Sequence, residues 1–193
     1  MEHKTRIDAR TIRTKEIIRT TLEKMILELD LQKITVSELT RRAEIDRKTF
    51  YLHYESLSEI FDELAGDIST NIIELINISS PDSQNIDFES LMNSYVAIHS
   101  TNPKLHKRLF CTDSYYSVFD KIQKNISEYL FHKISSQGIY DKNTLETTIL
   151  FLTYGINAIW RKCYKENECI TEEISTLTST FIEFCWKNIP FSK

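Results

Sequence analysis

Residues 35–54, TVSELTRRAEIDRKTFYLHY, contain side chains that could bind DNA. Arg47 and Lys48 are cations that suit the acceptor atoms of guanine or the oxygens of backbone phosphates. On a helix with 100° per residue they share one face with Tyr51, whereas Phe50 lies toward the other face. One face is therefore basic and the other largely apolar, which is typical of a helix that packs on its neighbours and enters the major groove.

Two helix start signals would position these side chains. Thr35 followed by Glu38 is a capping box, in which both side chains satisfy backbone amides, and it predicts a helix over residues 36–43. Asp46 can cap a second helix, and its carboxylate also suits the positive end of that helix's dipole. Two short helices separated by a tight turn predict a helix-turn-helix. At the start of the first helix, Thr35 and Ser37 are placed to bind a phosphate through hydroxyl and amide groups.

The same stretch resembles the DNA-binding segment of TetR-family transcriptional regulators, whose pattern is roughly T-V-x-x-I-A-x-x-A-G-V-S-x-x-T-x-Y-x-H/Y-F. The matching residues are Thr35, Val36, Leu39, Ala43, Ile45, Thr49, Phe50, Tyr51, His53 and Tyr54. The resemblance implies that Thr49, Tyr51 and His53 contact DNA bases or backbone, and that Phe50 and Tyr54 are packing residues.

The stretch departs from the family pattern at the turn and after the second helix. Glu44 stands where relatives carry glycine, and Glu55 and Leu57 stand where relatives often carry lysine. DNA affinity would then depend on Arg47 and Lys48, on the two arginines at 41 and 42, and on residues 1–15. This basic N-terminal segment is either an arm that touches DNA or a solvated tail.

Composition favours an all-α protein. The 193 residues include only three glycines and three prolines, and apolar residues recur mostly at helical spacing. The net charge is −4, but residues 1–55 carry 12 Lys and Arg against 10 Asp and Glu, so polyanion binding is plausible only at this end. No apolar run suits a membrane span or a signal core, and the four cysteines lack CxxC spacing, so we expect a soluble, cytoplasmic protein with reduced thiols.

We expect two domains: a three-helix helix-turn-helix domain over residues 1–55, and a helical regulatory and dimerisation domain over residues 56–193. Ser56 followed by Glu59 is a second capping box, which begins a long helix that joins the two and extends to about Asn77. The later helices are expected over residues 87–100, 103–111, 114–137, 143–164 and 171–188, with Gly138 ending the third of these.

The last two expected helices carry apolar residues at alternating spacings of three and four. The TetR resemblance implies that they form a four-helix bundle with the same pair of a second subunit; the alternative is that they close the subunit's own core. The residues expected at the dimer interface are Leu152, Ile156, Ile159, Cys163, Leu177, Phe181 and Phe184.

Aromatic and polar side chains lie on the helices that enclose the ligand cavity in TetR relatives. The candidate effector-binding residues are Tyr95, His99, Phe110, Tyr115, Tyr116, Phe119, Tyr154, Asn157 and Trp160. They combine apolar bodies with polar tips, as a small-molecule pocket does, although an ordinary core has a similar composition.

Catalytic, cofactor and metal sites are not expected. The sequence has no glycine-rich phosphate loop, no GxSxG and no HExxH. His99 and His106 are separated by Pro103, which breaks any common helical face, so they are not expected to be a pair of metal ligands. Cys163 and Cys169 are expected to be buried, inert thiols.

The sequence therefore predicts a homodimeric TetR-type regulator, a repressor that binds a pseudo-palindromic, double-stranded DNA operator. An unknown small-molecule effector would move the long helix and change the separation of the two DNA readers. The alternative is a TetR-like co-regulator or adaptor that acts through a protein partner with weak or no DNA binding of its own. A small-molecule enzyme is third.

Overall fold

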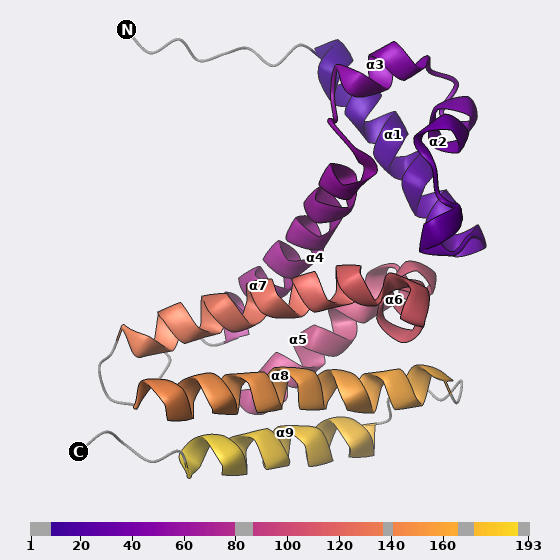
Figure 1. Ribbon diagram of the computed structural model, residues 1–193. Helices are drawn as coiled ribbons and strands as arrows, with labels where there is room; N and C mark the ends of the chain where they lie inside the picture. Colours follow the sequence, from indigo (N-terminus) through magenta and orange to yellow (C-terminus); the bar gives the residue numbers. More distant parts are fainter. Residues whose placement is uncertain (1–8, 80–86, 137–140, 166–171, 189–193) are drawn as a thin grey trace, which may run out of the picture. The chain divides into compact units, whose positions relative to one another are not determined.

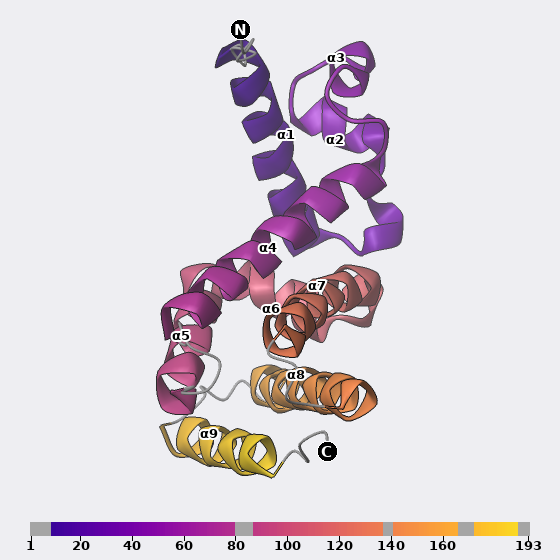
Figure 2. The same ribbon diagram turned by 90° about the vertical axis from the view of Figure 1, so that its left-hand side faces the viewer.

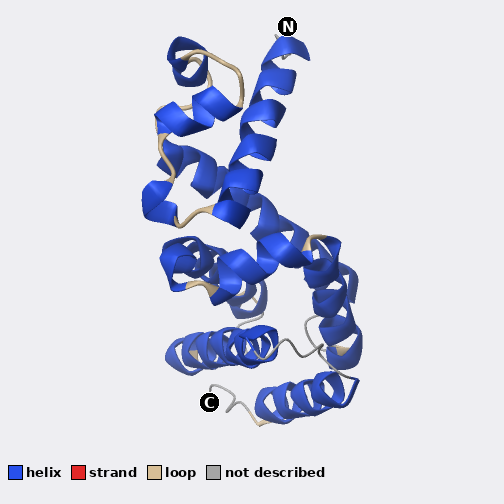
Figure 3. Ribbon diagram, turned by 90° about the vertical axis from the view of Figure 1, so that its right-hand side faces the viewer, coloured by secondary structure: helices blue, strands red, loops and turns tan. Residues whose placement is uncertain are grey.

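The computed structural model describes residues 9–79, 87–136, 141–165 and 172–188. These residues form helices and turns, with no strand among them, so the all-α prediction is confirmed (Figures 1 and 3). The chain divides into two compact units, residues 1–64 and 65–193, and the division falls inside helix α4, Leu57–Ser79. The boundary expected from the sequence, at residue 56, is one residue before the start of this helix.

The first unit contains α1 (Ala9–Glu28), the short 3-10 helix η1 (Leu31–Lys33), α2 (Val36–Arg42), α3 (Arg47–Tyr51) and the start of α4. The α-helices contribute their apolar faces to one core, as amphipathic helices do, whereas η1 has no buried residue. The buried residues of this core include Ile18, Leu22, Met25, Ile26, Leu39, Phe50, Tyr54 and Ile60.

The predicted N-terminal arm is wrong in part. Helix α1 already begins at Ala9, so Arg10, Arg13 and Lys15 are helical residues. Residues 1–8 lie outside the described residues. The buried face of this helix begins only at Ile18, so the spacing of its apolar side chains does not show where the helix starts.

The predicted caps explain where α2, α3 and α4 begin. Thr35 Oγ1 accepts a hydrogen bond from the amide of Glu38, at 3.2 Å. The carboxylate of Asp46 accepts a hydrogen bond from the amide of Thr49, at 2.7 Å, and this bond holds the pKa of Asp46 below its usual value. Such caps each stabilise a helix by ~1 kcal/mol. At α4, Ser56 Oγ accepts from the amide of Glu59.

The turn between α2 and α3 has an unusual backbone at Glu44, whose φ is 54°. Glu44 is the position at which the family pattern has glycine. The left-handed conformation brings the Cβ of an ordinary residue close to a backbone oxygen and costs roughly 1–2 kcal/mol, whereas glycine adopts it without this penalty. Backbone hydrogen bonds span the turn, since the amide of Glu44 donates to the carbonyl of Arg41 at 3.4 Å and the amide of Ile45 donates to the carbonyl of Thr40 at 3.1 Å.

Replacing Glu44 with glycine is expected to stabilise the first unit by about 1 kcal/mol, since the strain removed exceeds the extra chain entropy of glycine. Hydrogen exchange followed by mass spectrometry would show about fivefold slower exchange across residues 36–54. Glu44→Ala is the control, because it removes the charge but keeps the strained backbone. Equal protection in both variants would contradict this account.

The second unit contains the rest of α4, α5 (Phe88–Thr101), α6 (Pro103–Cys111), the 3-10 helix η2 (Asp113–Tyr115), α7 (Tyr116–Ser135), α8 (Lys142–Lys165) and α9 (Glu172–Lys187). These match the expected helices, although the helix expected from residue 114 begins as η2. Asn102 caps α6, and Pro103 occupies its first turn. The helix stop expected at Gly138 lies outside the described residues.

Helices α8 and α9 are antiparallel neighbours, and α9 also packs against α5 (Figures 1 and 2). One cluster of buried side chains, Phe88, Met92 and Ile182, joins α5 to α9, and Leu152 and Ile156 of α8 pack against it. Among the described residues, no helix is long and apolar enough to cross a membrane.

Candidate functional site

Helix α3 is divided into a buried and an exposed face. Phe50 and Tyr54 are 0% and 1% exposed, and their ring centroids lie 6.1 Å apart in the core of the first unit. Arg47, Lys48 and Tyr51 lie on the opposite, exposed face, with Tyr51 56% exposed. The packing face predicted from the sequence is therefore the face that holds α3, and the basic face points to solvent.

Tyr54 anchors the end of this segment to α1 and α4. Its hydroxyl donates to the Glu63 carboxylate at 3.2 Å, and Lys15 Nζ binds the same carboxylate at 3.1 Å. The ammonium of Lys15 also lies 4.6 Å from the centre of the Tyr54 ring. Burial and the neighbouring Glu63 raise the pKa of Tyr54 above its ordinary value. Tyr54 is thus a positioning residue for α3.

The first turn of α2 lies beside the start of α3. Ser37 Oγ accepts a hydrogen bond from a guanidinium nitrogen of Arg47, so the two helices present these side chains together. Thr35 and Ser37 are exposed, whereas Thr49 and His53 are half-buried. The hydroxyl of Thr35 is also the cap of α2, which limits its freedom to bind a phosphate.

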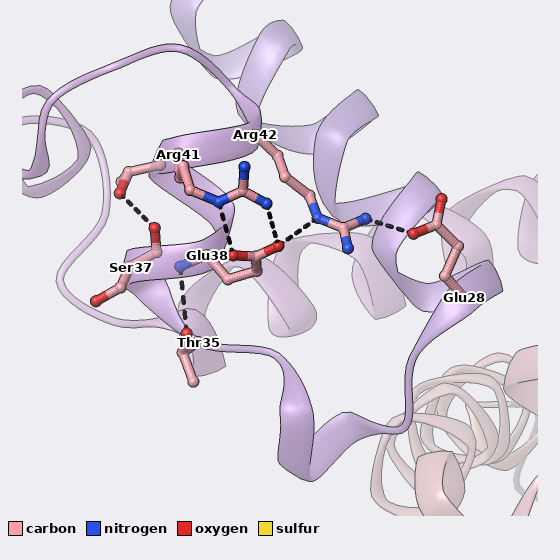
Figure 4. Close-up of polar contacts among 7 residues, drawn as sticks. Glu28, Thr35, Ser37, Glu38, Arg41 and Arg42 are labelled. Atoms are coloured by element: carbon pink, nitrogen blue, oxygen red, sulfur yellow. Dashed lines mark hydrogen bonds and ion pairs between the residues drawn. The ribbon is translucent and has the colours of Figure 1, made fainter.

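The arginines of α2 are paired with acidic side chains (Figure 4). Glu38 accepts hydrogen bonds from Arg41 at 2.7 and 2.9 Å and from Arg42 at 2.7 Å. Arg42 also binds Glu28 of α1. The hydrogen bonds from Arg41 and Arg42 lower the pKa of Glu38 to about 2, so this carboxylate stays ionised. The capping box therefore forms only on its threonine side, because the Glu38 carboxylate binds the arginines.

These four side chains balance one another in charge, two carboxylates against two guanidinium groups. Arg41 remains accessible, since its side chain is 70% exposed, whereas the side chain of Arg42 is 28% exposed. The exposed cations Arg47 and Lys48 of α3 therefore make the larger contribution to a positive surface on the helix-turn-helix.

Helix α9 has three of its large apolar side chains on the outside, although Ile182 is buried. Its buried side chains are mostly small and polar, including Ser175, Thr178 and Ser179. The exposed ones are Leu177, Phe181 and Phe184, at 70%, 52% and 64% exposed. A helix that packed only on its own subunit would bury these three, so this face fits a surface that another molecule covers.

A groove of about 480 Å³ runs between α8 and α9 beside this face. Its lining is mainly apolar and includes Phe151, Ile159, Cys163, Leu177 and Phe181. Phe151 and Phe181 bring their ring centroids to 6.4 Å, and both are more than half exposed. The exposed apolar surface therefore continues from α9 onto α8.

The candidate effector residues of the second unit form an aromatic cluster around His99, which is 1% exposed. The His99 ring stacks on Trp160 with centroids 4.4 Å apart. Edge-to-face contacts join it to Tyr95 at 4.7 Å, Phe110 at 4.9 Å and His106 at 5.0 Å. Five rings from α5, α6 and α8 thus meet in one buried place.

A chain of hydrogen bonds continues from this cluster into α7. Tyr95 donates to Asn157 Oδ1 at 2.7 Å, and Asn157 Nδ2 donates to Gln123 Oε1 at 2.8 Å. On the other side, Phe110 packs against Phe119 at 5.5 Å, and Phe119 meets Tyr154 at 6.2 Å. Eight of the nine predicted effector residues, all except Tyr115, are therefore joined by contacts. Tyr115 is fully buried, with the Arg108 guanidinium 5.6 Å from its ring centre, and Tyr116 is 50% exposed beside Phe119.

Comparison with known proteins decides the fold. No protein-family model matches the chain. The chain is 32% identical over 80 residues to the HTH-type transcriptional regulator YxbF of Bacillus subtilis, a match that covers 41% of this chain and 21% of that protein. A solved TetR-family transcriptional regulator of Haemophilus influenzae superposes with a TM-score of 0.62 at 16% identity, covering 95% of this chain and all of that one. The chain has the TetR fold.

A second solved structure with this fold is the dihydroxyacetone kinase operon activator DhaS, with a TM-score of 0.52 at 18% identity, covering 92% of this chain and 97% of that chain. The curated match spans about a fifth of YxbF. All three relatives are named as regulators or activators rather than as enzymes.

Within this TetR fold, the seven predicted DNA-binding residues come from the cap and first turn of α2, from α3 and from the turn that follows α3, and they lie in one unit.

The residues predicted at the dimer interface fall into an exposed group and a group that packs inside the subunit. Ile159, Leu177, Phe181 and Phe184 are exposed, whereas Cys163 is buried and Leu152 and Ile156 pack on the subunit's own core. The regular spacing of apolar residues did not distinguish these two environments, because a helix that packs on both sides is apolar on both.

Sequence reasoning missed His106 and Gln123 as members of the aromatic cluster. Pro103 does separate His99 and His106 into two helices, but α5 and α6 pack so that the rings still meet. The amphipathic pattern of α7 gave no signal for Gln123, which is 1% exposed on a face that is mostly apolar and also contains the buried Ser127. In the described part of the chain, no group of three or more His, Cys, Asp or Glu residues could hold a metal ion.

Proposed function

We propose that the chain is a TetR-family transcriptional regulator that binds a double-stranded DNA operator as a homodimer. The observation that carries this proposal is the division of α3. Phe50 and Tyr54 are buried and fix the helix, whereas Arg47, Lys48 and Tyr51 stand exposed on its other face. Such a helix can enter the major groove with its cationic side toward the bases and phosphates.

The side chains of the helix-turn-helix would have different roles. Lys48 and Tyr51 point from the exposed face toward base edges or backbone. Arg47, which is hydrogen bonded to Ser37, would contact DNA next to the start of α2. Thr35, Thr49 and His53 complete the surface with backbone contacts.

A second copy of the chain would cover the apolar face of α8 and α9. The exposed Leu177, Phe181 and Phe184 support this assignment, because a lone soluble chain rarely exposes such a set on one helix. A dimer with two-fold symmetry presents two readers, which suits a pseudo-palindrome whose half-sites are one helical turn apart, about 34–36 Å.

An effector bound in the second unit would regulate DNA binding. Helix α4 contributes residues to both units, so an effector that favours one position of α4 would alter the spacing of the two readers. We propose repression, in which the dimer occupies the operator until the effector binds. A transcription assay on the operator decides between repression and activation. The assay is needed because a protein with a similar fold is named as an activator.

The test is the double variant Arg47→Ala, Lys48→Ala. A duplex selected by the unmodified protein from a randomised library serves as the operator, and fluorescence anisotropy gives the affinity. We expect the double variant to bind about 100-fold more weakly, since each interaction of these cations with a base or phosphate contributes ~1–3 kcal/mol. The slope of log affinity against log salt should also fall, by about one for each phosphate that the variant no longer neutralises.

The matched control is Lys124→Ala, Lys142→Ala, which removes two cations from α7 and α8 in the second unit. It should leave affinity and salt slope unchanged. Equal affinity of the Arg47 and Lys48 variant and the unmodified protein would remove α3 from the DNA interface. Failure of the library to yield any duplex whose binding weakens steeply with salt would instead favour an adaptor that acts through a protein partner.

A further inference from the structure

The three arginines of the helix-turn-helix differ in what holds their guanidinium groups. Arg41 and Arg42 of α2 are bound by the carboxylate of Glu38, which offsets their charge. The partner described for Arg47 is the hydroxyl of Ser37, which is neutral. Arg47 is therefore oriented by a hydrogen bond and keeps its full positive charge for a ligand.

Both ends of this hydrogen bond stand on capped helices. Ser37 lies in the first turn of α2, whose start is capped by Thr35 (Figure 4). Arg47 is the first residue of α3, and the carboxylate of Asp46 caps that helix. The two helices are also in contact with each other. Because a long side chain loses much rotamer freedom when it is ordered, a guanidinium that is already anchored at its tip loses less on binding.

The guanidinium group of Arg47 can bind a second partner with two parallel N–H groups. Arginine has five N–H donors in one plane, and they form two edges that each carry a parallel pair. Nη2, which donates to Ser37, belongs to both edges and has one hydrogen on each. One edge therefore remains complete whichever hydrogen Ser37 accepts.

Guanine is the base that a complete edge of this kind suits. In the major groove guanine presents O6 and N7 as neighbouring acceptors, whereas adenine presents a donor beside its N7 and cytosine presents a donor. Phosphate oxygens accept the same pair of N–H groups, but the N-terminal residues of a recognition helix are the ones that contact base edges. Arg47 occupies this place on α3.

We propose that Ser37 is a positioning residue that directs Arg47 onto a guanine, and that each half-site of the operator contains a guanine whose O6 and N7 accept from the free edge of Arg47. This inference rests on the proposed function and deepens it, because it names the base that the DNA reader selects. It also gives Ser37 a role beyond contact with a phosphate. Without its hydroxyl, the guanidinium can turn to a neighbouring phosphate, which supports affinity but carries no sequence information.

Base analogues in the operator test the assignment. The operator is the duplex that the unmodified protein selects, and each guanine is replaced in turn, in both half-sites, by 7-deazaguanine, which lacks the N7 acceptor but keeps the base pair. At one position the affinity of the unmodified protein should fall at least about tenfold. In Arg47→Ala the same replacement should change affinity about twofold or less, which identifies Arg47 as the reader of that guanine.

Ser37→Ala should reduce this 7-deazaguanine penalty to about threefold or less, because Arg47 is present but no longer directed to the base. Ser37→Thr keeps a hydroxyl and should retain the penalty. Thr20→Ala, which removes an exposed hydroxyl from α1, is the matched control and should also retain it. The penalty is a ratio of two affinities of one variant, so a general loss of affinity or of folded protein cancels. All affinities are measured at one low salt concentration, at which weak variants still bind.

An unchanged penalty in Ser37→Ala would show that the hydroxyl does not position Arg47, and would overturn the inference. An operator in which no guanine shows an Arg47-dependent penalty would overturn it as well. In both cases, weaker operator binding by the double variant at Arg47 and Lys48 would still support the proposed function. Failure of the library to yield any operator would overturn the proposed function and this inference together.

Discussion

Replacing Leu177 and Phe181 with glutamate is expected to convert the proposed dimer of two 22.7 kDa chains into monomers. Both side chains are more than half exposed on α9 and border the groove between α8 and α9. Each would be buried twice in a symmetric dimer, and burying a Leu or Phe contributes ~1.5–3 kcal/mol, so dissociation should increase by at least about 1,000-fold. Sedimentation equilibrium at micromolar concentration measures the change in mass.

The matched control is Ile78→Glu, which places the same charge on another exposed apolar residue of the second unit, one that is 75% exposed on α4. This variant should remain dimeric. Circular dichroism should show unchanged helix content in both variants, because neither substitution touches a buried side chain. A Leu177 and Phe181 variant that keeps the mass of a dimer would show that the two copies associate through another surface.

The monomer should also lose operator affinity, although its helix-turn-helix is intact. A palindrome is bound tightly because the second reader engages at a high effective concentration once the first is bound. For a duplex with a single half-site, the monomeric variant should therefore have the same affinity as one helix-turn-helix of the unmodified protein. Comparing full and half-site duplexes separates a loss of dimerisation from damage to α3.

Local chemistry predicted the starts of α2, α3, α5 and α6 well because each has a short-range cause. Thr35, Asp46 and Asp87 each accept a hydrogen bond from an amide three residues later, and Pro103 begins α6. These interactions are contained in a few consecutive residues. The division of α3 into an apolar and a basic face is similarly a matter of spacing along one helix, and the burial of Phe50 confirms it.

The parts that sequence could not predict depend on contacts between distant segments. The pairing of Arg42 with Glu28 joins residues 14 apart, and the chain from Tyr95 through Asn157 to Gln123 joins three helices. Helical periodicity locates apolar residues but does not say whether the subunit's own core or another molecule covers them. For this reason Cys163 and Leu177 looked alike in sequence and differ in exposure, 4% against 70%.

Lowering the pH is expected to destabilise the unmodified chain more than a His99→Phe variant. Burial, with a smaller contribution from His106, lowers the pKa of His99 to about 3, whereas an unfolded histidine has an ordinary value of 6.5. Above pH 6.5 the imidazole is neutral in both states and adds no pH dependence. Between pH 6.5 and 3 the unfolded chain binds the proton first, so the free energy of unfolding falls as pH falls.

This linkage amounts to ~1.4 kcal/mol per pH unit, or about 2 kcal/mol at pH 5. Urea denaturation at pH 7.5 and pH 5.0, followed by the fluorescence of Trp160 and Trp186, measures it. Phenylalanine keeps the ring contacts of His99 but has no proton to bind, so the loss between the two pH values should be smaller by about that amount. His132→Phe, at an exposed position, should behave like the unmodified chain. Equal losses in His99→Phe and the unmodified chain would mean that the buried imidazole is not the group that couples folding to pH.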